Sequence, residues 1–481
     1  MAIERSLFPK GQAWFNERKN AAGYHYAPFS CYGFAWTAVV FILCLNDHQL
    51  LDFTRILKEM YSISPQDFRK KKFSTEIYSF LDTVSIFHQS DYFSRLFDME
   101  PKLMVTQDAL RMLPFVLSDS FLKAQVSKEV LINTIDSFSN TYNRGSLVWY
   151  LATLEKTIND MQEEHAVFDR PIVLMLSSGG HRISLSFNLH AKEWLFIDIE
   201  HGLPQSFKTH TDLALTLLQA LSANKDTVFT TQIMGRPEDA ALLEELANRW
   251  KNHPIMIEYI LRVTKDKLKR VDSSDRNLII RAAGQGEGDS NIIDTLLALA
   301  ASDKQALPKE WQLYMQDALW AACFGNHLTI VEKLLQAGVN DKNSVYKNLS
   351  LLAYTAFIGQ YDIVNLLLAY GANPDQVFKT SLSELEDINH CLGYTNKMKE
   401  FLYSRYSHRD VNFFKKNSTT KQISLTALDM AIIADEQKIA DRLKNASKAK
   451  QLRLFSLDRD SQKEFPPLTR ETQYASRRTW R

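Results

Sequence analysis

The chain contains little cysteine and carries almost no net charge. Four cysteines occur in 481 residues, Cys31, Cys44, Cys323 and Cys391, and they form no C-x-x-C pair and no Cys/His cluster. This excludes a disulfide framework and a zinc motif, and it favours free thiols in a reducing compartment. Lys and Arg number 57 against 56 Asp and Glu. Such a balance argues against electrostatic binding of the whole chain to nucleic acid or acidic membranes.

Long apolar segments and cofactor motifs are also missing. The N-terminal MAIERSLFPKG lacks the apolar core of a signal peptide, and the longest apolar run, residues 34–45, is too short to span a bilayer. The sequence has no HExxH motif, and GQGEGD at 284–289 lacks the Lys-Ser or Lys-Thr of a phosphate-binding loop. We therefore expect no signal peptide, no membrane span, no cofactor and no metal.

What is present changes in pattern along the chain. With 45% hydrophobic residues, 481 residues can form two or three domains with their own cores. Residues 32–60, and the stretch from there to about residue 165, have helix-like spacing. From Pro171 the runs IVLML, HRISLSF and EWLFID alternate with turn residues, as β-strands do. This order predicts an α+β domain over residues 1–206, followed by a connecting helical segment over residues 207–272.

The second half of the sequence is repetitive. The block ALWAACFGNHLTIVEKLLQAGVN at 318–340 returns as LAYTAFIGQYDIVNLLLAYGANPD at 352–375 with a period of 33, and weaker copies begin at residues 277 and 426. This is the period of ankyrin repeats. We predict an all-α solenoid over residues 273–445, with an insertion at about 376–422, and a flexible tail at 446–481. The concave face and the insertion are the expected protein-binding surfaces.

Cys31 immediately precedes an apolar segment that is expected to form a helix. A thiol at a helix N-terminus lies at the positive end of the helix dipole, which favours the thiolate nucleophile. A lone cysteine in this setting is more often buried and inert. A nucleophile therefore needs a base from elsewhere in the chain.

The predicted hairpin formed by HRISLSF and EWLFID supplies such a base. A turn centred between residues 189 and 190 pairs His181 with Asp198, with their Cβ atoms about 5 Å apart. An aspartate in this position can orient a catalytic imidazole. The rival His190 lies eight residues from Asp198, roughly 26 Å along the strand. His201 follows Asp198 too closely to approach it from the opposing strand, and His165 and His210 are expected to be exposed.

These motifs together resemble the YopT/AvrPphB group of papain-like effector proteases. The resemblance covers about residues 20–205, and the matching positions are Cys31, Gly33, Trp36, Gly179, Gly180, His181, Phe196, Asp198 and Gly202. It implies an α+β fold, a papain-like cysteine protease domain followed by an all-α ankyrin-repeat solenoid, with Cys31, His181 and Asp198 as the catalytic triad. In papain-like enzymes an amide five or six residues before the cysteine stabilises the oxyanion. His25 and Tyr26 occupy those positions here, and either can donate a hydrogen bond.

The combination with ankyrin repeats resembles the Legionella ankyrin-repeat effectors, which a type IV secretion system delivers into the cytoplasm or nucleus of a host cell. Two functions remain open. In the first, the chain is a secreted virulence effector with thiol protease (hydrolase) activity on a host protein, or with related acyl-transfer or deamidating chemistry. In the second, it is a catalytically inactive papain-like scaffold that acts as an ankyrin-repeat adaptor. In both, a monomer binds host proteins through its repeats, with no specific nucleic-acid partner.

Overall fold

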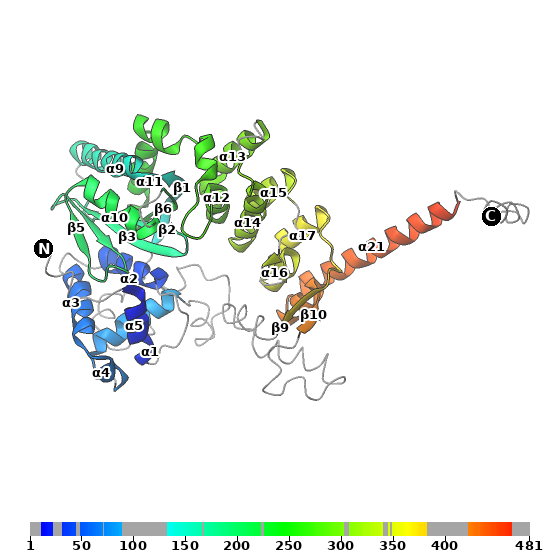
Figure 1. The fold of residues 1–481 in the computed structure, drawn as a ribbon, viewed down its shortest axis with the longest axis horizontal. Coiled ribbons are helices and arrows are strands. Elements are labelled where there is room, and N and C mark those ends of the chain that lie inside the picture. Colours follow the sequence, from blue (N-terminus) through cyan, green and yellow to red (C-terminus); the bar gives the residue numbers. More distant parts are fainter. Residues whose placement is uncertain are drawn as a thin grey trace, which may run out of the picture. The chain divides into compact units, whose positions relative to one another are not determined.

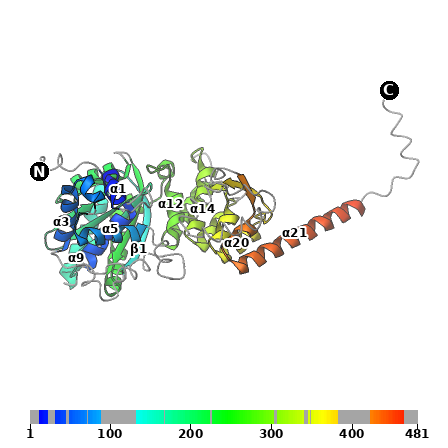
Figure 2. The same ribbon diagram turned by 90° about the horizontal axis from the view of Figure 1, so that it is seen from below.

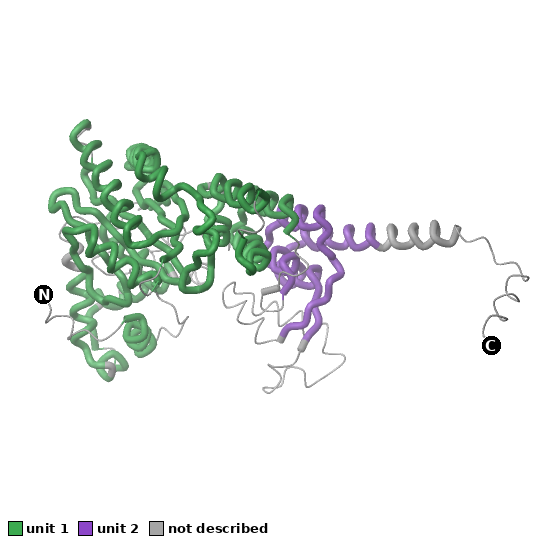
Figure 3. The backbone as a smooth tube through the Cα atoms, turned by 45° about the horizontal axis from the view of Figure 1, so that its top comes forward, with its two compact units in different colours: residues 1–339, 390–393 green, residues 340–389, 394–481 purple. Residues whose placement is uncertain are grey.

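A computed structural model of the chain describes residues 11–22, 31–44, 49–70, 72–88, 132–165, 168–222, 226–302, 307–339, 345–346, 349–381 and 422–463. The chain forms two compact units, one made of residues 1–339 and 390–393 and the other of residues 340–389 and 394–481 (Figure 3). The α+β part and the first two helix pairs of the repeat region belong to the first unit. The remaining repeat helices belong to the second.

The first unit contains a six-stranded antiparallel sheet with the spatial order β1-β6-β2-β3-β4-β5 (Figure 1). Its strands are β1 (Asn133–Tyr142), β2 (Ile172–Ser178), β3 (His181–Asn188), β4 (Glu193–Ile197), β5 (Gln205–Phe207) and β6 (Thr227–Gly235). Since β6 lies between β1 and β2, the sheet is complete only when the chain reaches residue 235.

Helices cover both faces of this sheet. One face is packed by residues of α1, α2, α3, α4 and α5, and the other by residues of α9, α10 and α11. The helices are α1 (Gly11–Ala21), α2 (Cys31–Cys44), α3 (Gln49–Ser62), α4 (Pro65–Arg69), α5 (Thr75–His88), α9 (Arg144–His165), α10 (His210–Ser222) and α11 (Ala240–Lys251), with short helical turns η2 (Pro237–Asp239), η3 (Met256–Leu261) and η4 (Lys265–Lys269). The result is a helix–sheet–helix sandwich.

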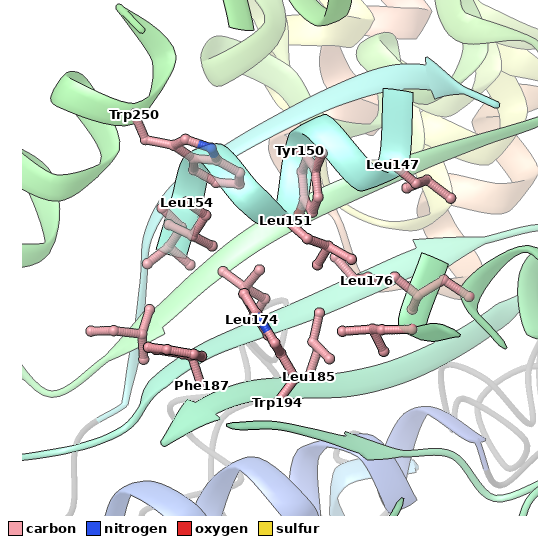
Figure 4. Close-up of a cluster of buried hydrophobic side chains, with 14 of the residues drawn as sticks. Leu147, Tyr150, Leu151, Leu154, Leu174, Leu176, Leu185, Phe187, Trp194 and Trp250 are labelled. Carbon is pink, nitrogen blue, oxygen red and sulfur yellow. The ribbon is translucent and has the colours of Figure 1, made fainter. Parts of the chain in front are cut away.

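Side-chain periodicity explains how the two cores form. In α9 the buried residues recur every three or four positions, while in β2 and β3 every second residue points to the same core. Figure 4 shows the two sets facing each other, with Leu147, Tyr150, Leu151 and Leu154 from the helix and Leu174, Leu176, Leu185 and Phe187 from the strands. Each such side chain stabilises the fold by about 1.5–3 kcal/mol when fully buried.

The first half of the chain differs from the sequence predictions at two places. The helical pattern expected up to residue 165 is interrupted by β1, whose inner positions include the buried polar residues Ser139, Asn140 and Thr141. Because these buried positions are polar, the strand lacks the apolar and polar alternation by which a strand is recognised in a sequence. Residues 207–272 do not form a connector, because β6 pairs with both β1 and β2, and α10 and α11 contribute to the same core as α9. The α+β domain therefore extends well beyond residue 206.

Among the described residues, four helix pairs follow at the expected repeats. The first unit holds α12 (Leu278–Gln285) with α13 (Ser290–Ser302), joined by η5 (Gly286–Asp289), and α14 (Trp311–Phe324) with α15 (Leu328–Gln336). The second holds α16 (Leu351–Phe357) with α17 (Tyr361–Ala369), and α20 (Ala427–Ile433) with α21 (Gln437–Lys463). Leu334, Leu335 and Leu367 of these helices are buried, and Leu368 is half-buried.

Short strands accompany the repeats of the second unit. These are β7 (Val345–Tyr346), β8 (Leu349–Ser350), β9 (Phe378–Ser381) and β10 (Gln422–Leu425). β9 and β10 pair antiparallel, with Ser381 opposite Gln422, and so form the base of the predicted insertion, whose residues 382–421 lie outside the described ranges. Helix α21 continues to Lys463, well past α20 (Figure 2). Residues 446–463 of the expected flexible tail are therefore helical, and 464–481 are not described.

Candidate active site

Helix α2 begins at Cys31 and places this residue beside the turn that joins β2 and β3. The helix sequence CYGFAWTAVVFILC is apolar almost throughout, and the helix packs against α5 and β3. Burial of this helix holds its first residue against the start of β3, where the Cys31 Sγ donates a hydrogen bond to the Gly180 carbonyl at 3.3 Å. Cys31 is a free thiol and only 3% exposed.

A tight glycine turn forms the other side of the site. β2 and β3 are paired up to Ser178 and His181, so that Gly179 and Gly180 alone connect them. Their φ angles are +50° and +83°, and a two-residue hairpin turn with positive φ at both positions strongly favours glycine. The turn thus presents the carbonyl that accepts from Cys31 and, one residue later, the side chain of His181.

His181 and Asp198 are in contact, as predicted. The imidazole Nε2 lies 2.8 Å from Oδ1 of the carboxylate. The predicted strand register is nevertheless wrong by two residues, because Leu185 pairs with Phe196 and the hairpin closes through residues 189–192. A shift of two residues returns every side chain to the same face of the sheet. His181 and Asp198 therefore become diagonal neighbours, and their side chains still reach each other.

His201 is a second partner of Asp198 that the sequence analysis missed. Its Nδ1 lies 2.9 Å from the Asp198 Oδ2, the oxygen that His181 does not use. Asp198 follows the last residue of β4, and a tight turn returns the chain, with the His201 and Gly202 N–H groups donating to the Asp198 carbonyl at 3.1 Å. His201 therefore reaches Asp198 from the turn that follows β4 and not from the opposing strand. The D-x-x-H-G spacing was the available signal.

The contacts around Asp198 shift two pKa values in opposite directions. Burial by itself lowers the pKa of His181, but hydrogen bonds with Asp198 and Cys31 outweigh burial and raise it to about 10. Burial raises the pKa of Asp198, while His181, His201 and the Glu200 N–H stabilise the carboxylate and lower the pKa to about 2. At neutral pH the two side chains form an imidazolium–carboxylate pair, and the Cys31 Sγ contacts the carbonyl of Gly180, the residue before His181.

The other residues of the predicted motif have mixed roles. Trp36 stacks on Phe87 at 5.6 Å between ring centroids and belongs to the core. Arg182, which follows His181, lies over the ring of Tyr32, which follows Cys31, at 4.0 Å. The predicted oxyanion residues His25 and Tyr26 lie outside the described ranges.

The rival histidines lie away from Cys31. His190 is exposed in the turn between β3 and β4. His210 was expected to be exposed but is half-buried. Its Nε2 lies 2.7 Å from the Glu155 carboxylate of α9. The described residues include no cluster of three or more His, Cys, Asp or Glu side chains arranged to hold a metal ion. Among the helices that the structure describes, none combines the length and apolarity needed to cross a bilayer.

Comparison with known proteins bears on the second half of the chain. A family model for ankyrin repeats, in three copies, matches residues 279–377. These residues include helices α12 to α17, and the chain therefore contains ankyrin repeats, which are protein-interaction modules. None of the curated proteins matches the chain.

Proposed function

We propose that the chain is a thiol protease with Cys31 as nucleophile, His181 as the proton-transfer residue and Asp198 as its orienting carboxylate. The observation that carries the proposal is that the Cys31 Sγ lies 3.3 Å from the carbonyl oxygen of Gly180, the residue before His181, and that the His181 Nε2 lies 2.8 Å from Asp198. A nucleophile close to a histidine whose imidazole is oriented by a carboxylate is the arrangement used in nucleophilic acyl transfer. Three chain segments supply these residues: the start of α2, the start of β3 and the end of β4.

The chemistry proceeds in two halves. After the Cys31 thiol has lost its proton to solvent, the thiolate attacks the carbonyl carbon of the scissile amide, and the protonated His181 donates its proton to the leaving nitrogen as the C–N bond breaks. The resulting thioester is hydrolysed by a water molecule whose proton is accepted by the now neutral His181. The Cys31 backbone N–H lies at the start of a helix, where N–H groups have no partner within the helix, and can donate to the oxyanion.

In this proposal the ankyrin repeats capture the protein substrate and raise its local concentration at the site. We further propose, from the resemblance to ankyrin-repeat effectors, that the protein is secreted by a type IV system and acts in the host cytoplasm or nucleus. The host protein it acts on is defined by the repeats, since the groups around Cys31 provide general acyl-transfer chemistry. Deamidation or acyl transfer would use the same three residues.

One observation favours the adaptor function as a second candidate. Cys31 is 3% exposed and the His181 side chain 16% exposed, so that a peptide has little of either group to contact directly. An adaptor would bind its partner through the ankyrin repeats alone and would retain the buried triad as part of the fold. The two candidates differ in whether Cys31 reacts with a peptide electrophile.

The deciding experiment is covalent labelling with a thiol-reactive peptide probe. The proposed protease should be labelled stoichiometrically, and Cys31→Ala should abolish labelling with no change in thermal stability beyond about 1–2 kcal/mol. Cys323→Ala is the matched control, because Cys323 is also a buried free thiol but lies in repeat helix α14. Mild iodoacetamide should likewise select Cys31. Labelling that persists in Cys31→Ala, or none in the unmodified protein, would favour the adaptor.

A further inference from the structure

The glycine turn beside Cys31 is held by residues that lie just before the ankyrin array. The Gly179 N–H donates to Oδ2 of Asp272 at 3.0 Å, and the Ser274 hydroxyl donates to the Gly179 carbonyl at 2.5 Å. A Cβ atom on Gly179 would lie 3.3 Å from the Ser274 backbone nitrogen, so the two loops are in close contact. Both backbone polar groups of Gly179 are thus bonded to residues 272–274.

Asp272 is itself fixed by a buried ion pair with the first repeat helix. Its Oδ2 accepts from the Arg281 Nε at 2.7 Å and also contacts Nη2, while Oδ1 accepts the Ser274 and Arg276 N–H groups at 2.8 and 3.1 Å. The Asp272 side chain is fully buried. A buried carboxylate with this many donors is held in one orientation, because each lost bond would leave it poorly solvated.

Arg281 lies in α12, and the first repeat is also hydrogen-bonded to the edge strand β1 of the sheet. The carboxylate of Asp289, which ends the loop after α12, accepts the Ser139 N–H of β1 at 2.9 Å, and the Gln285 side chain donates to Ser137 at 3.1 Å. Helix α12 therefore contacts the sheet at β1 and, through Arg281 and Asp272, at the β2–β3 turn. A helix bonded at both places has little freedom to move relative to the turn.

We infer that Ser274, Asp272 and Arg281 are positioning residues for the Cys31–His181 pair, so that the first ankyrin repeat forms part of the support of the active site. The connection runs from Arg281 through Asp272 to Gly179, and from there along the backbone to the Gly180 carbonyl and His181. This inference rests on the proposed function. Small displacements of reacting groups are costly, since about 1 Å of misplacement can reduce a rate about 100-fold.

The test uses the full chain and the substitution Ser274→Ala, with Ser302→Ala in α13 as the matched control. Ser274 is exposed, so its removal affects no core packing, and the change is neutral. Ser302→Ala also removes an exposed hydroxyl that donates to a backbone carbonyl, that of Leu299 at 2.9 Å, and leaves the bond from Ser274 to Gly179 in place. Two quantities are followed: the pKa of the His181 imidazole by NMR of ¹³C-labelled histidine, and the iodoacetamide rate of Cys31 against pH.

Ser274→Ala should lower the pKa of His181 by at least about half a unit and reduce the alkylation rate of Cys31 about 3- to 10-fold at pH 7. The double substitution Asp272→Asn with Arg281→Gln should produce larger shifts in the same directions. Ser302→Ala should change neither quantity. An unchanged His181 pKa in folded Ser274→Ala and double-substituted protein would overturn the inference.

The inference and the proposed function fail in different ways. If Cys31 of the unmodified protein is no more reactive than Cys323, the thiol protease proposal loses its support, while the His181 pKa in the variants still decides whether the first repeat positions the imidazole. If Cys31 is reactive and neither its pH profile nor the His181 pKa moves in the variants, the protease proposal stands and the positioning role is wrong.

Discussion

Asp198 brings two histidines together, with Oδ1 facing His181 and Oδ2 facing His201. The carboxylate is almost fully buried, and it also accepts the Glu200 N–H at 3.1 Å. A buried carboxylate with three donors is strongly restricted in orientation. His201 therefore contributes to the direction in which Asp198 presents Oδ1, even though it is remote from Cys31 in the hydrogen-bond chain.

We expect Asp198→Asn to lower the pKa of His181 from about 10 toward its ordinary value of 6.5, because the substitution removes the negative charge beside the imidazole. Peptide cleavage at pH 7 should fall by about 10²–10⁴-fold, as when the orienting aspartate of a triad is replaced. NMR titration of His181 and a cleavage assay measure the two effects. His190→Asn, in the exposed turn, is the control. A pKa that stays near 10 would contradict this assignment.

The same pair makes stability depend on pH with a defined sign. The pKa of His181 is raised in the folded state, so its contribution is complete below 6.5 and is lost as the pH rises through about 10. The pKa of Asp198 is lowered, so its contribution is complete above 3.8 and is lost as the pH falls through about 2. The difference in stability between unmodified protein and Asp198→Asn should therefore be greatest between about pH 4 and 6.5.

At the scale of elements, the β3–β4 hairpin shows what strand alternation predicts and what it does not. Alternation placed His181 and Asp198 on one face correctly, because side chains repeat every two residues along a strand. The register depends on the turn, and a turn over residues 189–192 replaced the expected tighter one. His201 escaped prediction because its contact is made by a turn after β4, where strand periodicity no longer applies.

The insertion between the third and fourth helix pairs offers an element-scale prediction. Because Ser381 and Gln422 are directly paired at the end of β9 and β10, residues 382–421 can be replaced by Asn-Gly, which closes a two-residue hairpin. We expect the shortened protein to keep its melting temperature within a few degrees, since loop length has a small effect on stability of about 0.6 kcal/mol per doubling.

Binding to a protein partner, measured by co-precipitation from a cell lysate followed by mass spectrometry, should weaken at least about 10-fold if the insertion supplies central contacts of the interface. An equally long Gly/Ser segment in place of residues 382–421 is the control for loop length. Unchanged recovery of the same partner by the shortened protein would rule out the insertion and leave the surface of the repeats as the binding site.

At the scale of the whole molecule, the placement of β6 decides where the α+β domain ends. A fragment of residues 1–206 lacks β6, which pairs with both β1 and β2 in the middle of the sheet, as well as the core helices α10 and α11. We expect this fragment to unfold or aggregate, because two strands would expose unpaired edges and one face of the sheet would lose much of its cover.

A fragment of residues 1–339 retains the complete sheet and the first two helix pairs and should unfold cooperatively. Circular dichroism and thermal denaturation compare the two fragments, with the full chain as reference. Cooperative unfolding of residues 1–206 would show that the sheet is stable without its central strand, contrary to the topology. Both results are independent of any catalytic activity.

Features that depend on local periodicity and residue chemistry could be predicted without a structure. The 33-residue repeat specified the ankyrin helix pairs, and two-residue alternation brought His181 and Asp198 to one face; both patterns are carried by residues close together along the chain. Three other features became visible only in the folded chain: β6 separates β1 from β2, His201 contacts Asp198, and Asp272 and Arg281 hold the turn beside Cys31. Those contacts depend on which surfaces pack together across long stretches of sequence, and no local pattern encodes that choice.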